Sequence, residues 1–108
     1  MTETNLEAGA APLAGLVDYQ EGSIVSRTLL KRAAGNVTLF AFDRGQELSE
    51  HTTPHDALLM CVEGATLVTI QDEQHRLAAG DLILLPANVP HAVRASERFK
   101  MLLTMIRE

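Results

Sequence analysis

The chain has 108 residues, of which 46% are hydrophobic and 21% are charged, and its formal net charge of −5 gives an isoelectric point near 5.3. This length fits one domain with one hydrophobic core, and the nine basic residues form no positive surface for nucleic acid. No apolar run reaches the roughly 20 residues that span a bilayer, and the first residues lack the order of a signal peptide. We therefore expect no membrane partner and a cytoplasmic location, in agreement with the single cysteine, Cys61.

The predicted elements follow one another as short strands. Residues 1–16 are small and weakly polar, so we expect a flexible N-terminal tail before a single domain over residues 17–108. Beyond Ser23, segments rich in Val, Ile, Leu, Thr and Phe alternate with turn residues every eight to twelve positions or so, which is typical of an all-β sandwich or barrel. Strands are predicted over 24–32, 37–42, 57–62, 65–70, 74–78, 82–85, 91–95 and 99–106, with turns at 35–36, 43–45, 63–64, 71–73 and 79–81.

Alternation along an extended chain indicates which side chains share a face. If His51 faces the interior, the same face carries Thr53, His55, Ala57, Leu59 and Cys61. The opposite face then carries Leu58, Met60 and Val62, and such an apolar row needs a second sheet or a second subunit to cover it. Residues 81–85 are apolar at both parities, which predicts a strand buried on two sides. Both patterns favour a homodimer that forms through one sheet.

Two stretches of the chain resemble the paired motifs of the cupin superfamily. In the first motif Gly45, His51 and Gly64 fit, whereas Thr53 and Ala57 stand where the family has its second histidine and its glutamate. In the second motif the fitting residues are Gly80, Pro86 and His91, while Asn88 replaces an inner glycine and Ala95 a terminal asparagine. Asparagine tolerates the positive φ that the glycine position requires.

The chain from Leu16 to Arg107 is similar to the small, stand-alone bacterial cupins. The resemblance implies a double-stranded β-helix, that is, a jelly-roll barrel, which is often dimeric and in which both motifs line a central pocket. It implies no particular reaction, because cupins include oxygenases, isomerases, other enzymes and ligand-binding sensors.

His51 and His91 are the two ligand positions of the family motif that carry histidine here. Two imidazoles hold a divalent ion poorly unless a third protein ligand joins them. His55 shares the parity of His51, and Asp56 offers a carboxylate if the loop rolls by one residue. Our hypothesis is a divalent transition metal (Zn, Fe, Ni or Mn) bound by His51, His91 and either His55 or Asp56. In the alternative, the two histidines bond each other or a water and hold no ion.

The remaining candidates concern the pocket wall and two further side chains. The wall is predicted to be apolar, to admit a small ligand with one or two metal-binding oxygens, and to consist of Thr53, Ala57, Leu59, Cys61 and Ala95. Cys61 is expected to be a buried, inert thiol, and His75, in the polar stretch QDEQHRL, a solvated surface residue.

Three functions agree with these patterns. The first is a metal-dependent oxygenase or isomerase of a small oxygenated molecule. The second is a non-catalytic ligand-binding or sensor cupin with a metal-free site, and the third is a packing protein with a vestigial pocket.

Overall fold

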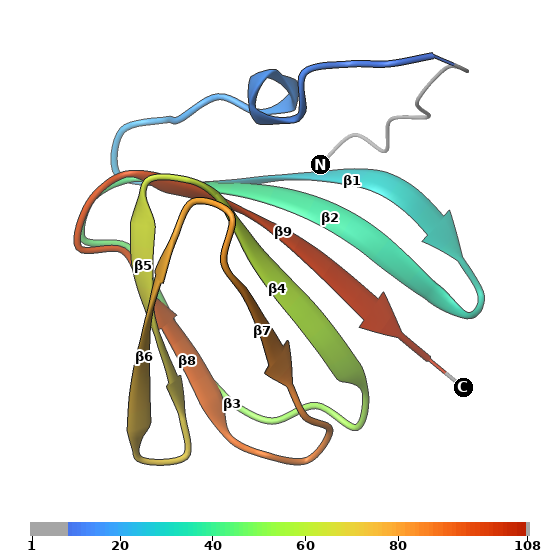
Figure 1. Ribbon diagram of the computed structural model, residues 1–108, viewed down its shortest axis with the longest axis vertical. Helices are drawn as coiled ribbons and strands as arrows, with labels where there is room; N and C mark the ends of the chain where they lie inside the picture. Colours follow the sequence, from blue (N-terminus) through green and yellow to red (C-terminus); the bar gives the residue numbers. More distant parts are fainter. Residues whose placement is uncertain (1–8, 108) are drawn as a thin grey trace.

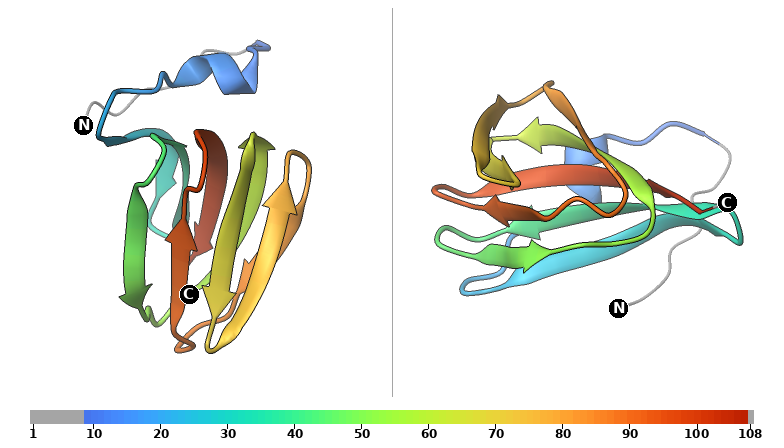
Figure 2. Two further views of the ribbon diagram at one scale, coloured as in Figure 1. Left: turned by 90° about the vertical axis from the view of Figure 1, so that its left-hand side faces the viewer. Right: turned by 90° about the horizontal axis from the view of Figure 1, so that it is seen from below.

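The computed structural model describes residues 9–107, which form two antiparallel sheets that face each other (Figures 1 and 2). The five-stranded sheet contains, in spatial order, β1 (Ile24–Arg32), β2 (Gly35–Phe42), β9 (Phe99–Ile106), β4 (Asp56–Glu63) and β7 (Leu82–Leu85). The four-stranded sheet contains β3 (Glu47–His51), β8 (His91–Arg94), β5 (Ala65–Ile70) and β6 (Glu73–Ala78). The predicted all-β jelly-roll barrel is confirmed.

The predicted strands all have counterparts, and the main differences lie at β3 and at the first hairpin. β3 was not among the predicted strands. The predicted turn at Gly35 and Asn36 is wrong, because both residues begin β2 and the turn is formed by Ala33 and Ala34. Gly35 is needed for a different reason: a Cβ at this position would collide with the main-chain carbonyl of Met105 on β9.

The core lies between the two sheets. Inward-facing residues of both sheets form its buried cluster, in which the rings of Phe42 and Phe99 stack with centroids 4.6 Å apart. The parity predicted for β4 is confirmed, because Ala57, Leu59 and Cys61 belong to this cluster. The barrel interior is therefore filled at this level, and space for a ligand has to be sought at its ends.

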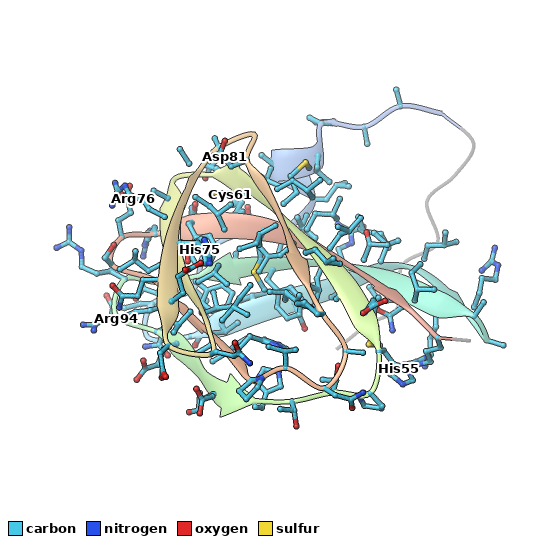
Figure 3. All side chains as sticks on the ribbon, turned by 60° about the horizontal axis from the view of Figure 1, so that its bottom comes forward. His55, Cys61, His75, Arg76, Asp81 and Arg94 are labelled. Atoms are coloured by element: carbon cyan, nitrogen blue, oxygen red, sulfur yellow. The ribbon has the colours of Figure 1, made fainter. Side chains whose placement is uncertain are left out.

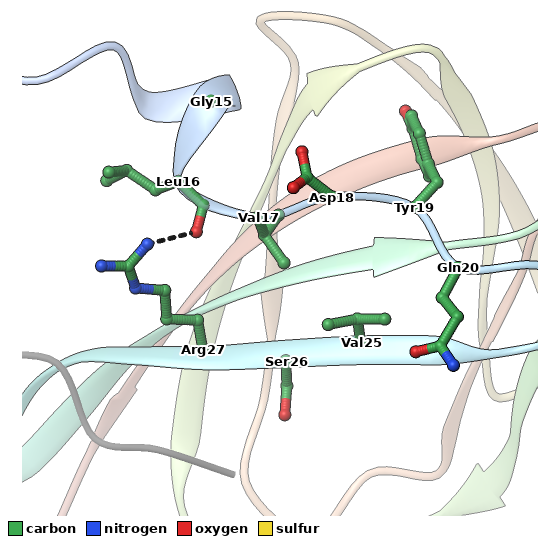
Figure 4. Close-up of a pocket in the computed structure, with 9 residues that line it drawn as sticks. All are labelled: Gly15, Leu16, Val17, Asp18, Tyr19, Gln20, Val25, Ser26 and Arg27. Carbon is green, nitrogen blue, oxygen red and sulfur yellow. Dashed lines mark hydrogen bonds between the residues drawn. The ribbon is translucent and has the colours of Figure 1, made fainter.

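The segment before β1 covers part of the outer face of the five-stranded sheet. It contains the 3-10 helix η1 (Leu13–Leu16), and together with residues 17–19 it contacts a second apolar cluster around Leu29, Leu39 and Ala41. Figure 4 shows this segment above β1, where the Arg27 guanidinium donates to the Leu16 carbonyl at 2.7 Å. The predicted flexibility of residues 1–16 stays a prediction, and residues 1–8 lie outside the described part of the chain.

Further polar contacts around Lys100, Tyr19 and Glu63 hold this segment in place. The Lys100 Nζ, on a side chain that is only 8% exposed, donates to the Ala14 carbonyl at 2.6 Å and lies 3.7 Å from a Glu63 carboxylate oxygen. The Tyr19 hydroxyl donates to the same carboxylate at 2.6 Å, and Lys100 Nζ lies 4.8 Å from the centre of the Tyr19 ring. Burial and the Glu63 carboxylate both raise the pKa of Tyr19.

The rest of this outer face is apolar and uncovered. Its exposed side chains are Leu30, Leu58, Leu82, Leu84 and Ile106, with exposed fractions between 41% and 58%. The predicted burial of residues 81–85 on both sides is wrong for the single chain, because Leu82 and Leu84 point away from the core and no residue among 9–107 covers them. No helix within residues 9–107 is both long and apolar enough to cross a membrane.

Candidate functional site

The pairing of β3 with β8 brings His51 and His91 side by side. They are direct cross-strand partners, and their ring centroids lie 4.4 Å apart in an edge-to-face arrangement. A bulge in β3 makes this possible. Leu48 pairs with Val93 and His51 with His91, so between these pairs two residues of β3 lie opposite one residue of β8. The extra residue places the His51 side chain on the inner face of the four-stranded sheet, the face from which Leu48 packs against the core. The sequence-predicted pair is therefore assembled.

Both imidazoles are oriented by main-chain carbonyls. His51 Nδ1 lies 2.9 Å from the Ser49 carbonyl oxygen, and His91 Nδ1 lies 3.3 Å from that of Val89. A carbonyl only accepts, so each neutral ring carries its proton on Nδ1 and leaves a lone pair on Nε2. This arrangement, with a carbonyl behind each ring, is the one that orients histidines for metal ligation.

The two rings differ in exposure. His91 is 7% exposed, whereas His51 is open to solvent. Burial lowers the pKa of His91; the Val89 carbonyl opposes this shift and the neighbouring His51 adds to it. Near neutral pH His91 is therefore an uncharged acceptor.

The other two candidate ligands lie on the loop between β3 and β4. Asp56 Oδ1 accepts a hydrogen bond from the Ala87 main-chain N–H at 2.7 Å, which joins this loop to the one between β7 and β8. The Thr53 hydroxyl donates to the His55 carbonyl at 3.0 Å, so it acts within the loop. Figure 3 shows His55 at one side of this end of the barrel, well separated from His75. The loop thus has structural hydrogen bonds of its own.

Three segments surround this end of the barrel, which we call the mouth: residues 50–56, 70–75 and 86–91. Main-chain hydrogen bonds connect them, from Asn88 to the Thr53 carbonyl at 2.7 Å and from Gln71 to the Pro90 carbonyl at 2.8 Å. Asn88 has φ of 64°, as its place at a glycine position of the motif predicts. The mouth is a connected rim around the histidine pair.

The residues predicted to line the pocket lie deeper. Leu59, Cys61 and Ala95 are 0% exposed and Ala57 is 9% exposed, all within the core cluster. The Cys61 thiol is close to the carbonyls of Glu63 and Gly64, at 3.8 and 3.5 Å, and burial raises its pKa. The expected burial of this thiol is confirmed, and the raised pKa disfavours the reactive thiolate.

His75 lies closer to the site than its sequence context indicated. It pairs across strands with Val68, and Leu77 lies two residues further on the same strand; both are core residues. His75 therefore shares the inner face of the four-stranded sheet, where its Nε2 lies 3.1 Å from Glu73 Oε1. Its side chain is 37% exposed, so it contacts solvent, and the face on which it lies was not part of the prediction. The spacing to Leu77 was the signal that could have placed it.

The site fits a metal ion only in part. Within residues 9–107 no group of three or more His, Cys, Asp or Glu side chains is arranged to hold an ion. His51 and His91 offer two nitrogen ligands, while one Asp56 oxygen already accepts from Ala87. Resident metal sites usually have three protein ligands, so a third would have to come from a movement of the loop.

The fold and this pair of histidines at the end of a jelly-roll barrel define a small cupin-like protein. The cupin domain model matches residues 38–106, and the chain belongs to the cupin family. The comparison with curated proteins finds no match.

Solved structures agree with this assignment. A conserved protein of unknown function from Streptococcus pyogenes is 36% identical, with a TM-score of 0.90, over 95% of this chain and 90% of that one. A cupin superfamily protein from Desulfitobacterium hafniense is 28% identical, with a TM-score of 0.90, over 95% and 94%. A cupin 2 conserved barrel domain protein from Leptotrichia buccalis is 38% identical, with a TM-score of 0.84, over 88% of this chain and 46% of that one.

Proposed function

We propose that this cupin binds a small ligand at the mouth of its barrel, where His51 and His91 hold a divalent transition metal ion through Nε2. One observation supports this most directly: a main-chain carbonyl engages Nδ1 of each ring, so each ring has the lone pair of its Nε2 available, and the two rings lie on neighbouring strands. His55 or Asp56 is the third protein ligand of the proposal. The bound ion would supply Lewis acidity or an O₂ site, which suits an oxygenase or isomerase of a small oxygenated molecule.

The chain's own residues contribute positioning. The Ser49 and Val89 carbonyls fix the two rings, and burial keeps His91 neutral and able to ligate. The hydrogen bond from Ala87 to Asp56 fixes the position of the rim next to the pair. Side chains that are already oriented in the free protein lower the free-energy cost of ordering on ligand binding.

Metal analysis tests the proposal. Protein purified without a nickel column and then soaked in Zn²⁺ is expected to retain about one equivalent per chain after desalting, and His51→Gln or His91→Gln is expected to reduce this severely. His55→Gln and Asp56→Asn decide which residue is the third ligand. Glu97→Gln, at the opposite end of the barrel, is the matched control. Retention of only a small fraction of an equivalent by the unaltered protein would contradict the metal site.

A metal-free ligand-binding module is the second candidate. The absence of a third ligand near the pair, within the part of the chain that the structure describes, favours it. In that case His51 and His91 accept hydrogen bonds from the ligand directly. A ligand that binds equally well with and without a metal chelator would identify this form.

We also propose that a second copy of the chain covers the exposed apolar face of the five-stranded sheet. This face continues the patch that residues 13–19 already cover, so apolar side chains extend along the outer side of the sheet beyond that segment. A two-fold dimer needs only one such patch, because each copy presents the same surface. The uncovered part contains an apolar groove of about 200 Å³ lined by Asp56, Ala57, Leu58, Leu84 and Ile106.

A further inference from the structure

The ionisable side chains of the mouth differ in kind from those of the rest of the chain. All four histidines lie in its three segments, residues 50–56, 70–75 and 86–91, together with four carboxylates, whereas none of the nine lysines and arginines does. The four carboxylates are Glu50, Asp56, Asp72 and Glu73. A small anion that enters this end of the barrel meets no permanent positive charge near neutral pH.

Strand register places two of these groups on the same inner face as the histidine pair. One row of cross-strand partners runs across the four-stranded sheet from His51 to His91, Ile70 and Glu73. His75 lies in the next row, and a hollow of about 510 Å³ at this hairpin is lined by Ile70, Gln71, Asp72, Glu73 and His75. Figure 3 shows His75 on β6. The hollow and the histidine pair therefore meet at Ile70.

The polar side-chain atoms that face the hollow and the pair are mainly acceptors. The Nδ1 protons of His51 and His91 go to carbonyls, which leaves Nε2 of both rings as acceptors. His75 directs Nε2 at the Glu73 carboxylate, so its neutral ring has its lone pair on Nδ1. The carboxylates of Asp72 and Glu73 are acceptors as well, and among the side chains that line the hollow the Gln71 amide carries donors besides the His75 N–H that faces Glu73.

A buried acceptor at the centre of this surface lacks a partner. His91 is only 7% exposed, and its one hydrogen bond among residues 9–107 uses Nδ1. No side-chain nitrogen or oxygen in that range is both sealed from solvent and unpaired, so Nε2 is reachable from outside. An acceptor in a largely desolvated place gains most from a donor that brings positive charge.

We infer that the mouth takes a small organic amine, bound as its ammonium ion, with the Glu73–His75 pair as one wall and His91 Nε2 as the inner acceptor. This rests on the metal-free form of the proposed ligand site, in which His91 Nε2 is not bound to a metal ion, and specifies the ligand class of that form. Glu73 supplies the opposite charge, and the three imidazole lone pairs accept from the N–H and O–H groups of the ligand. Carboxylates and phosphates of similar size are disfavoured, because they bring further acceptors to a surface that offers few donors.

Three probes with the same two-carbon skeleton test the charge preference: ethanolamine, ethylene glycol and glycolate. Each is titrated at about pH 7.5 into ¹⁵N-labelled, chelator-treated protein while amide shifts are followed. Ethanolamine is expected to bind at least about tenfold more tightly than glycolate, with shifts centred on residues 70–75 and 91. Tighter or equal binding of glycolate, or shifts centred elsewhere, would overturn the inference.

Variants and a metal titration separate this inference from the metal proposal. Glu73→Gln is expected to weaken ethanolamine binding by about threefold or more and to leave Zn²⁺ retention unchanged, whereas the control Glu97→Gln changes neither. If Zn²⁺ shifts His51 and His91 but ethanolamine shifts nothing, the ligand class is wrong and the metal site stands. If ethanolamine binds and Zn²⁺ does not, the metal proposal is wrong and the ligand class stands.

Discussion

Replacing Leu82 and Leu84 on β7 by glutamate tests the proposed dimer. Both side chains are more than half exposed in the single chain, so the changes leave the core intact. In the dimer they would place two carboxylates per copy in an apolar contact. Leu67→Glu is the matched control, since Leu67 lies on the outer face of the other sheet, where its cross-strand partners are Arg76 and Arg94.

The magnitude follows from the exposed fractions of the five apolar side chains on this face, which lie between 41% and 58%. Complete burial of a Leu or Ile contributes roughly 1.5–3 kcal/mol, so burial of the exposed half contributes roughly 0.8–1.5 kcal/mol. Two copies together gain about 8–15 kcal/mol, against an association cost of about 4–15 kcal/mol. The net gain therefore lies between none and about 11 kcal/mol, and a micromolar dissociation constant, which needs about 8 kcal/mol, lies in the favourable part of that range. The double variant loses roughly 3–6 kcal/mol, which weakens the dimer about 10²- to 10⁴-fold.

Light scattering after size-exclusion chromatography, over about 1 to about 200 µM protein, measures this directly. The unaltered chain and Leu67→Glu are expected to approach twice the chain mass of 11.7 kDa, while the double variant stays at the single mass. Circular dichroism melts check that all three proteins fold. An unaltered chain that is monomeric at the highest concentration, or a double variant that dimerises equally well, would refute the reasoning.

Three further predictions use the same structure. Burial lowers the pKa of His91 in the folded chain below its ordinary value of 6.5, so the unfolded chain binds the proton more readily. The contribution of neutral His91 to the free energy of unfolding should therefore be fully present above pH 6.5 and be lost as the pH falls below it. Thermal melts across this pH range should show a smaller decrease in Tm for His91→Gln than for the unaltered chain. Tyr19→Phe removes the hydroxyl that donates to Glu63 and should cost about 1 kcal/mol, or about 4–8 °C in Tm, and an unchanged melt would show that this contact contributes nothing. Cys61, 0% exposed, should resist alkylation at neutral pH until urea unfolds the chain, and rapid labelling of the native protein would show a reactive thiol.

The barrel could be predicted because its sequence signals are local. The Gly and Pro spacing of the second motif leads into a turn in which Asn88 adopts positive φ, and such a turn needs no long-range information. β3 gave no such signal, because Glu47, Ser49 and Glu50 are polar and exposed. Its register and its bulge are set by the pairing with β8, which no local pattern encodes.

Strand parity was sufficient to predict the parts of the site that lie on strands. It was not sufficient for the residues of the loop between β3 and β4. His51 and His91 meet as expected, whereas the positions of His55 and Asp56 depend on the path of the loop around Pro54. Asp56 is held by the Ala87 N–H, more than 30 positions away in sequence, and no spacing rule indicates that contact. The inner face of His75 was missed because its polar neighbours outweighed its two-residue spacing to Leu77.

Asp56 lies where the proposed dimer face and the mouth meet. Its residue lines the apolar groove with Leu58, Leu84 and Ile106, and its carboxylate accepts from Ala87 on the rim. A second copy packed on this groove would hold the strand end in place and keep that carboxylate on Ala87, away from His51. His55 would then be the third metal ligand in the dimer, so His55→Gln should reduce Zn²⁺ retention more than Asp56→Asn at protein concentrations that favour the dimer. Equal retention by both variants under these conditions would show that neither residue completes the site and that His51 and His91 act as a pair.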